Sequence, residues 1–278
     1  MKDGIGFIEI LDIFGDDVTV VNAARVSFAK EVTEIKEGDK KLIRFLARHN
    51  HISPFFHPQV RFRIKMPIFV AREWYRHTIG FSRNEVSRRY VDSAPEVWIP
   101  ANEDLRSKDK NKKQGSRLET IMNAETVLKD IEKFMEVSLN LYDSLLLSQV
   151  APEIARCVLP QSMYTEFIET GSLAAYARLV GLRMDPGAQI EIRRYAEAVS
   201  FLLAKAFPES WAALEDARRG DGVQWKEEKG GAEVVRKDEA GNEVRYVKLT
   251  AAGAGAGAPA ALERNSLEYD FVTNYWGT

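Results

Sequence analysis

Residues 59–66, QVRFRIKM, alternate strictly between apolar and basic side chains once the strand pattern begins at Val60. The two sets occupy alternate positions: Val60, Phe62, Ile64 and Met66 against Arg61, Arg63 and Lys65. Successive side chains of a strand point to opposite faces, so this pattern predicts a strand buried on one face only. Pro67 follows at a position suited to the first turn of a helix, and residues 67–77 are predicted to form that helix.

Other segments carry the period of a strand or a helix. Residues 6–14 predict a strand, residues 18–28 a short helix, and residues 40–49 an amphipathic helix with Leu42, Phe45 and Leu46 on one face. Apolar stripes predict two longer helices, over residues 118–147 and 188–206. The stripe positions are Ile121, Ala124, Leu128, Ile131, Met135, Leu139, Tyr142 and Leu146 in the first, and Ile192, Tyr195, Ala196, Val199, Leu202 and Leu203 in the second. Few strands and several long helices indicate an α+β fold.

The chain changes character after Arg218. A hairpin is predicted around Glu239–Asn242, an alanine- and glycine-rich linker covers residues 251–261, and an aromatic tail follows. We therefore predict a catalytic domain over residues 1–218 and a C-terminal appendage over residues 219–278.

Charge and cysteine content exclude several classes of protein. The formal net charge of -2 gives no global basic field of the kind that attracts polymeric nucleic acid or an acidic membrane. Cys157 is the one cysteine, which excludes an internal disulfide and a metal site of several cysteines. The sequence shows neither a signal peptide nor a long uninterrupted apolar run, so we expect a cytoplasmic protein that binds neither membrane nor nucleic acid polymer.

Residues 75–91, YRHTIGFSRNEVSRRYV, crowd cationic and polar side chains directly after the predicted helix. On that helix, residues four apart share neighbouring faces, which pairs Arg72 with Arg76 and Glu73 with His77. If residues 84–90 are extended, their side chains divide between two faces: Glu85, Ser87 and Arg89 against Asn84, Val86 and Arg88. Guanidinium and hydroxyl groups suit a phosphate, and a carboxylate suits a sugar or a base, so the stretch is typical of a nucleotide pocket. A solvated loop with ion pairs at a helix end fits the spacing equally well.

Three of the four histidines fall in a second cluster, ARHNHISPFFH: His49, His51 and His57. A His-x-His pair resembles part of a metal site, but no carboxylate or cysteine stands close by to complete it, and we expect no metal. Histidines flanked by Phe55 and Phe56 would also stack near a flat cofactor. Packed or surface histidines are the simpler alternative.

A third cluster, in residues 152–196, places Arg156, Arg178 and Arg183 among apolar neighbours. A buried arginine is costly without an anionic partner, so each is expected to meet either a ligand or a carboxylate. The candidate carboxylates are Glu166, Glu169 and Asp185. Cys157 is a candidate nucleophile beside Arg156, although its apolar neighbours favour an inert buried thiol.

These clusters, in this order, resemble the flavin-dependent thymidylate synthases. The family signature is Arg-His-Arg, a spacer, then Ser, continuing to Arg-Tyr, and here it stands as Arg76-His77-Thr78, then Ser87, ending Arg89-Tyr90. Six blocks match the family in order: AARVSF, HISPFFH, PIFVAREWYRH, NEVSRRY, IARCVLP and LRMDPGAQIEIRRYA. The resemblance runs from about residue 6 to residue 211 and does not extend past Arg218.

The resemblance implies a twisted, mainly antiparallel sheet flanked by long helices, in a homotetramer with active sites shared between subunits. It implies reductive methylation of dUMP to dTMP, with methylenetetrahydrofolate as one-carbon donor and FAD, reduced by NADPH, as redox cofactor. This route needs no cysteine nucleophile. The implied catalytic residues are Arg183, held against the pyrimidine edge, and His51. The implied dUMP-binding positions are Glu73, Arg76, Glu85, Val86, Ser87, Arg88, Arg89, Arg156 and Arg183. The implied FAD-binding positions are Ser27, His51, Ser53, Arg76, His77, Thr78, Asn84, Glu85, Ser172 and Arg178.

The chain departs from the commonest family pattern in several places. Thr78 replaces the second arginine of the signature, and the spacer is one residue longer. Glu73 stands where the family often has a glutamine, and Phe56 where it has a glutamate. Arg178 replaces an asparagine, and Gly187 replaces a histidine. We hypothesise that Arg178 offsets the charge lost at Thr78. The departures keep open a second interpretation, a nucleotide- or flavin-binding homologue with lost or altered turnover. The three clustered histidines keep open a third interpretation, a metal-dependent hydrolase.

Overall fold

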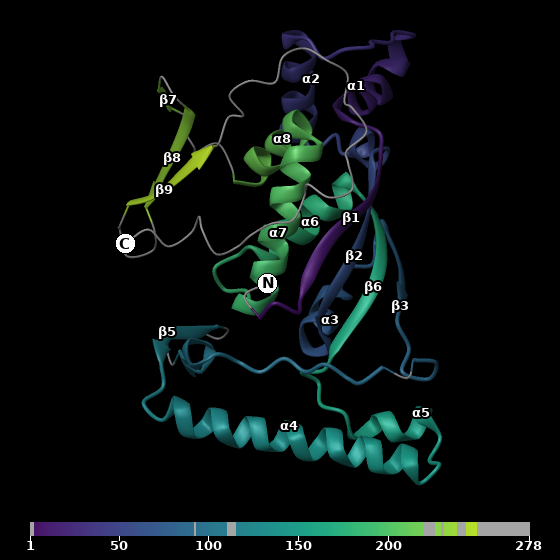
Figure 1. Ribbon diagram of the computed structural model, residues 1–278. Helices are drawn as coiled ribbons and strands as arrows, with labels where there is room; N and C mark the ends of the chain where they lie inside the picture. The colour runs from purple at the N-terminus through teal and green to yellow at the C-terminus, as the bar shows by residue number, and fades with distance from the viewer. Residues whose placement is uncertain are drawn as a thin grey trace.

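The computed structural model describes residues 3–91, 93–109 and 115–219, together with three strands between residues 226 and 248. Its centre is a four-stranded antiparallel sheet in the order β1 (Phe7–Phe14), β2 (Gln59–Pro67), β6 (Tyr164–Ser172) and β3 (Phe81–Glu85) (Figure 1). The apolar side chains of this sheet form one core with helices that lie between its strands in the chain and helices that follow them. The α+β class and the antiparallel sheet are therefore confirmed.

Strand β2 shows why the alternating segment directs the fold. The side chains of Val60, Phe62, Ile64 and Met66 are fully buried, while Arg61 and Arg63 are exposed on the other face. Pro67 is the last residue of β2 and stands immediately before α3 (Ile68–Trp74), not at its first helical position. Helix α3 is also shorter than predicted, because Arg76 and His77 donate backbone hydrogen bonds three residues back, to Glu73 and Trp74. Arg76 and His77 therefore follow the helix.

The first two helices pack over one end of the sheet. Helix α1 (Asp17–Arg25) begins at a capping box of Asp16 and Thr19 and continues into the 3-10 turn η1 (Val26–Phe28). Helix α2 (Glu37–Arg48) buries Ile43, Leu46 and Ala47, and Leu42 packs against the core, whereas Phe45 is 50% exposed, so the predicted apolar face is confirmed at Leu42 and Leu46 and was wrong at Phe45. The cause is an ion pair between the buried Asp39 and the partly exposed Arg25 of α1, which turns the Asp39 side of α2 inward.

The middle of the chain forms a peripheral layer. The elements are η3 (Asn102–Asp104), β4 (Arg106–Lys108), β5 (Ser116–Thr120), α4 (Ala124–Leu147), α5 (Pro152–Ala155) and η4 (Arg156–Val158). The helix predicted from residue 118 begins instead at Ala124, because the residues before it pair with β4, Thr120 opposite Arg106. Helix α4 lies across one end of the molecule with α5 beside it (Figure 1).

The last helices close the core. They are α6 (Leu173–Arg183), α7 (Ile190–Ala206) and α8 (Pro208–Arg219). All six apolar residues predicted for the buried side of α7 are buried, so that prediction is confirmed. Among the described residues, no helix combines the length and apolar content needed to cross a membrane.

Strands β7 (Lys226–Glu228), β8 (Gly231–Lys237) and β9 (Glu243–Lys248) form a separate antiparallel sheet. Strands β8 and β9 lie on either side of the position where the sequence predicts a hairpin, with Lys237 opposite Glu243. The predicted linker over residues 251–261 and the aromatic tail lie outside the described residues.

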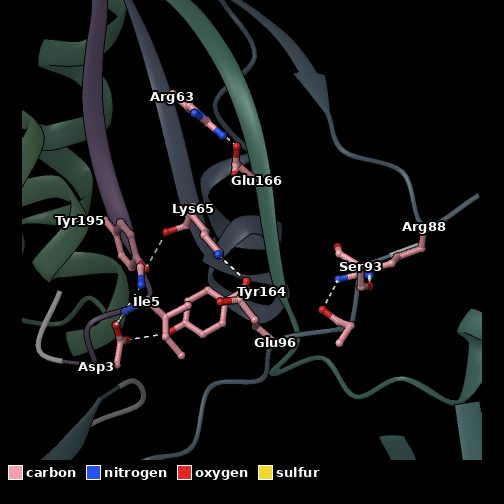
Figure 2. A network of polar contacts seen from close by, with 12 residues as sticks. Asp3, Ile5, Arg63, Lys65, Arg88, Ser93, Glu96, Tyr164, Glu166 and Tyr195 are labelled. Carbon is pink, nitrogen blue, oxygen red and sulfur yellow. Dashed lines mark hydrogen bonds and ion pairs between the residues drawn. The ribbon is translucent and has the colours of Figure 1, made fainter. Parts of the chain in front are cut away.

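The start of the chain is tied to the sheet by a polar network shown in Figure 2. The Asp3 carboxylate accepts hydrogen bonds of 2.9 Å from the backbone N–H groups of Ile5 and Gly6 and one of 2.5 Å from the Tyr164 hydroxyl. The hydroxyl of Tyr195, on α7, donates to the Lys65 carbonyl at 3.0 Å. These bonds join β1, β2, β6 and α7 at the end of the sheet where β2 ends and β6 begins.

Candidate active site

Arg183, the last residue of α6, meets two of the predicted site residues across more than 100 positions of sequence. Its Nε donates to His77 Nε2 at 2.9 Å. Its Nη1 forms an ion pair of 3.1 Å with Glu73 Oε2, and its Nη2 donates to the Glu73 carbonyl at 2.8 Å. The sequence offered three other carboxylates as partners, but Glu166 pairs with Arg63 and Asp185 accepts from the Gly187 N–H. The partner is therefore Glu73, which the fold brings from α3.

His77 is held as a neutral imidazole. Arginine has no hydrogen-bond acceptor, so the bond from Arg183 requires a free lone pair on His77 Nε2 and leaves the ring proton on Nδ1. Burial, followed by the positive charges of Arg183, Arg83 and Arg178, lowers the pKa of His77 from 6.5 to about 4. At neutral pH this side chain carries no charge and has one N–H to donate to a ligand.

The first part of the spacer, before β3, forms a turn. The Phe81 N–H donates to the Thr78 carbonyl at 3.3 Å, and Gly80 has φ +83°, a conformation that favours glycine. A Cβ at Gly80 would also lie 2.9 Å from the Cβ of Ala175, so α6 packs directly on this turn. Arg178, also on α6, donates from Nη2 to the Ile79 carbonyl at 2.6 Å. A guanidinium therefore lies one residue from Thr78, the position that lacks its arginine.

Two residues of β3 that were predicted to contact ligands, Asn84 and Glu85, lie on opposite faces of the sheet. Glu85 accepts a hydrogen bond of 2.5 Å from the buried Thr165 hydroxyl, and Arg83 pairs with the buried Glu169 on the same side. Asn84 alternates with them and is exposed on the other face. Asn84 and Glu85 of one chain therefore cannot contact the same ligand from one face of the sheet.

The extended conformation predicted for residues 84–90 ends at Glu85. Ser87 opens a turn in which its carbonyl accepts from the Tyr90 N–H at 3.0 Å, so the predicted alternation of Ser87 and Arg89 with Val86 and Arg88 was wrong. Arg88 bends back and donates to the Ser93 carbonyl, as Figure 2 shows. The turn gathers its polar groups at the end of β3.

Two arginines from different segments, Arg89 and Arg156, lie close to α5. Arg89 Nε lies 3.4 Å from the carboxylate of Glu153, on α5. Three residues later, Arg156 begins η4 with an exposed side chain. The Ser87–Tyr90 turn and the α5–η4 segment therefore lie together, and both offer exposed cationic side chains.

Cys157, in η4, is exposed, so the prediction of a buried thiol was wrong. The apolar residues around it in sequence do not enclose it because η4 is a surface turn, and Val158 is only partly buried.

The predicted flavin contacts near the N-terminus are exposed. His51 lies beside Phe45, with ring centroids 5.8 Å apart, and Phe45 also contacts His49 at 4.3 Å. Ser53 in η2 (Ser53–Phe56) and Ser27 in η1 are exposed as well. Ser172 differs, because it is buried and its hydroxyl accepts from the Ala175 N–H as the N-cap of α6. Within the described part of the chain, no three histidine, cysteine or carboxylate groups are arranged to hold a metal ion.

One element of the site was missed from the sequence. Arg83 pairs with Glu169, directly opposite it on β6, and Glu169 also accepts from Trp74 Nε1 at 3.2 Å. Burial raises the pKa of Glu169, and Arg83 acts in the opposite direction. The signal was available, because Arg83 alternates with Asn84 in the same way as Glu85 does.

The family model for "Thymidylate synthase complementing protein" matches residues 9–209, which include every residue described above from the Arg183 cluster to the α5–η4 segment. The chain belongs to the flavin-dependent thymidylate synthase family. It is 40% identical over 211 residues to a flavin-dependent thymidylate synthase of Thermus thermophilus, a match that covers 76% of each chain. It is 42% identical over 219 residues to one from Kosmotoga olearia, covering 78% of this chain and 93% of the relative. The family is one of methyltransferase enzymes.

Solved structures agree with this assignment. A UMP/dUMP methylase from Streptomyces cacaoi, bound with 5-Br dUMP, superposes with a TM-score of 0.69 at 32% identity over 77% of this chain and 96% of that one. The same methylase bound with 5-Br UMP matches at 31% identity, also with a TM-score of 0.69. The match to the family model ends before β7, so it does not include the C-terminal strands.

Proposed function

We propose that this protein converts dUMP to dTMP, with methylenetetrahydrofolate as the one-carbon donor and FAD, reduced by NADPH, as the redox cofactor. The observation that carries the proposal is the convergence of Arg183, Glu73 and His77. These residues come from two distant segments, and the family resemblance assigns Arg183 and Glu73 to dUMP and His77 to FAD.

Arg183 is the proposed electrophilic group. For C5 of uracil to attack a one-carbon unit, negative charge must spread over N3 and the carbonyl oxygens of the ring. A guanidinium is permanently charged and presents several N–H donors in one plane, so it stabilises that charge. Its three nitrogens are already oriented by Glu73 and His77 in the absence of substrate.

The residues present fit an anionic dinucleotide cofactor. Arg83, Arg178 and Arg183 all lie close enough to His77 to lower its pKa. Arg83 and Arg183 are paired with Glu169 and Glu73, whereas Arg178 contacts the Ile79 carbonyl, so Arg178 is the cation best placed to meet a cofactor phosphate. Arg178 and Thr78 would hold FAD beside the Ile79 turn, together with His77, whose Nδ1–H is available. His51 and Ser53 are the exposed candidates from the second cluster. Bound FAD would supply the hydride chemistry that no side chain of this protein provides.

The same geometry supports a site completed by a second chain. His77 precedes β3, whereas Ser87 and Arg89 follow it, and its five residues separate the two groups by about 17 Å, at ~3.4 Å per residue. That separation exceeds the span from the ring to the phosphate of one mononucleotide. We therefore infer that one dUMP is bound by two subunits. Its uracil lies against Arg183 of one subunit, and its phosphate is bound by residues of another: Ser87, Arg88, Arg89 and Arg156.

Helix α4 supplies a surface for such an assembly. Phe134, Val137 and Leu141, spaced three and four residues apart on one face, are 59%, 57% and 46% exposed. An apolar stripe of this kind is typical of a subunit interface. We propose that α4 packs against other copies of the chain in the expected homotetramer.

The second candidate function is a nucleotide- and flavin-binding homologue without turnover, favoured by the threonine at position 78. Two measurements separate the two. Purified protein should be yellow, and dUMP should perturb the flavin spectrum in either case. Rescue of a thymidine auxotroph is expected only for the enzyme, and failure of a well-expressed, flavin-loaded protein to rescue would contradict the proposed activity.

A further inference from the structure

The carboxylate beside the proposed catalytic arginine departs from the commonest family pattern. Glu73 Oε2 lies 3.1 Å from Arg183 Nη1, and the Glu73 carbonyl accepts from Nη2 at 2.8 Å. Glu73 thus holds both terminal nitrogens of the guanidinium, and His77 holds the third. A glutamine, which the family often has at this position, offers an oxygen of the same shape but no charge.

The charges of this group cancel when no ligand is bound. Glu73 contributes −1, Arg183 +1, and His77 none, since its Nε2 accepts a hydrogen bond from an obligatory donor. The nearest additional cations are Arg83, which is paired with buried Glu169, and Arg178, which is directed at the Ile79 carbonyl. A pyrimidine against Arg183 therefore meets a guanidinium whose field is partly offset by the Glu73 carboxylate.

We propose that Glu73 is a positioning residue for Arg183 and that its negative charge limits how strongly Arg183 stabilises a pyrimidine anion. The inference rests on the proposed function, because it requires the uracil to lie against Arg183. Glu73 fixes the guanidinium plane through its carboxylate and carbonyl. The same carboxylate raises the free energy of negative charge developing on the ring.

The two effects separate in substitutions at position 73. Glu73→Gln keeps an acceptor for Nη1 and removes the charge. Glu73→Ala removes both the acceptor and the charge, but leaves the backbone carbonyl that Nη2 contacts. Glu209→Gln is the matched control, since Glu209 pairs with Lys40 of α2 at 2.6 Å and takes no part in the Arg183 cluster.

The probe is 5-bromo-dUMP, whose halogen acidifies N3 so that ionisation of the ring is followed near neutral pH by its ultraviolet spectrum. Each variant is titrated with pH in the presence of the nucleotide, with the protein alone at the same pH as reference. A charge a few ångströms away shifts a pKa by about 1–3 units, and the Glu73 side chain is 34% exposed, so we expect the lower end of that range.

Glu73→Gln is expected to lower the pH midpoint for ionisation of the bound ring by about one unit, with nucleotide affinity within about threefold of the wild type. Glu73→Ala is expected to weaken nucleotide binding by about tenfold or more, because the guanidinium loses its side-chain support. Glu209→Gln should match the wild type in both measurements.

An unchanged midpoint in Glu73→Gln, with the nucleotide bound, would overturn the charge-setting role while leaving the proposed function intact. Full affinity in Glu73→Ala would overturn the positioning role. A wild-type protein that does not bind 5-bromo-dUMP would instead overturn the proposed function, and this inference with it.

Discussion

The buried pair of Arg83 and Glu169 gives the sharpest stability prediction. The Glu169 side chain is fully buried and that of Arg83 is 15% exposed, and Trp74 Nε1 also donates to this carboxylate. Replacing Arg83 with methionine keeps most of the side-chain volume and leaves a carboxylate without its counter-charge. Removing one partner of a buried pair costs about 3–5 kcal/mol of unfolding free energy. For a domain of this size, each kcal/mol lowers the melting temperature by about 2–4 °C, so we expect a fall of about 6–20 °C.

The deficit should also depend on pH. Without Arg83, burial alone raises the pKa of Glu169 above its usual value of 4.5, so the folded variant takes up a proton that the unfolded chain releases more readily. A group whose pKa is raised on folding contributes stability below its unfolded pKa and loses it as pH rises. Arg83→Met should therefore approach the wild type near pH 4.5 and fall furthest behind it at neutral pH.

Urea unfolding at several pH values measures both effects, with Arg63→Met as the matched control. Arg63 also pairs across strands with a β6 carboxylate, Glu166, but the two side chains are 48% and 29% exposed. That substitution should cost no more than about 1 kcal/mol. The double variant Arg83→Met/Glu169→Gln should recover at least half of the loss, because no buried charge remains. A single Arg83→Met variant within about 1 kcal/mol of the wild type at pH 7 would refute the reasoning.

Three further predictions concern the cofactor, the thiol and the assembly. Arg178→Ala should lower flavin retention through dialysis by about tenfold, since the guanidinium beside the Ile79 turn is lost; unchanged retention would remove Arg178 from the flavin site. Cys157→Ala should keep turnover within about twofold, because the proposed flavin route uses no thiolate, and a folded but inactive variant would contradict that route. Val137→Glu, which places a charge on the exposed face of α4, should dissociate the assembly in analytical ultracentrifugation, and an unchanged mass would exclude this face from the interface.

The sequence was most informative where one periodicity dominated a segment. The alternation in β2 and the apolar stripe of α7 are both matched by the structure, because each segment buries a single continuous face. The prediction that Phe45 of α2 is buried failed because Asp39, a charged residue, takes an inward position through its pair with Arg25. Residues 118–120 were included in the predicted helix although its apolar stripe begins only at Ile121, and their pairing with β4 places them in a strand.

For the candidate site, the sequence identified residues but not the contacts between them. The resemblance pointed to Arg183, Glu73 and His77, but no spacing rule shows that the first donates to the other two, because the contact spans more than 100 residues. The alternation predicted for Ser87 and Arg89 failed because a turn follows Glu85. Cys157 was expected to be buried from its neighbours in sequence, whereas exposure depends on where η4 lies in the fold.

The central claim is that Arg183 serves thymidylate synthesis, and formation of dTMP by the purified protein tests it most directly. Protein loaded with FAD is incubated with dUMP, methylenetetrahydrofolate and NADPH, and dTMP is measured by chromatography for the wild type and for Arg183→Ala. We predict dTMP from the wild type only when all three small molecules are present, and a loss of about 100-fold or more in Arg183→Ala, with flavin still bound. Wild-type protein that binds flavin and dUMP and yet forms no dTMP would contradict the account.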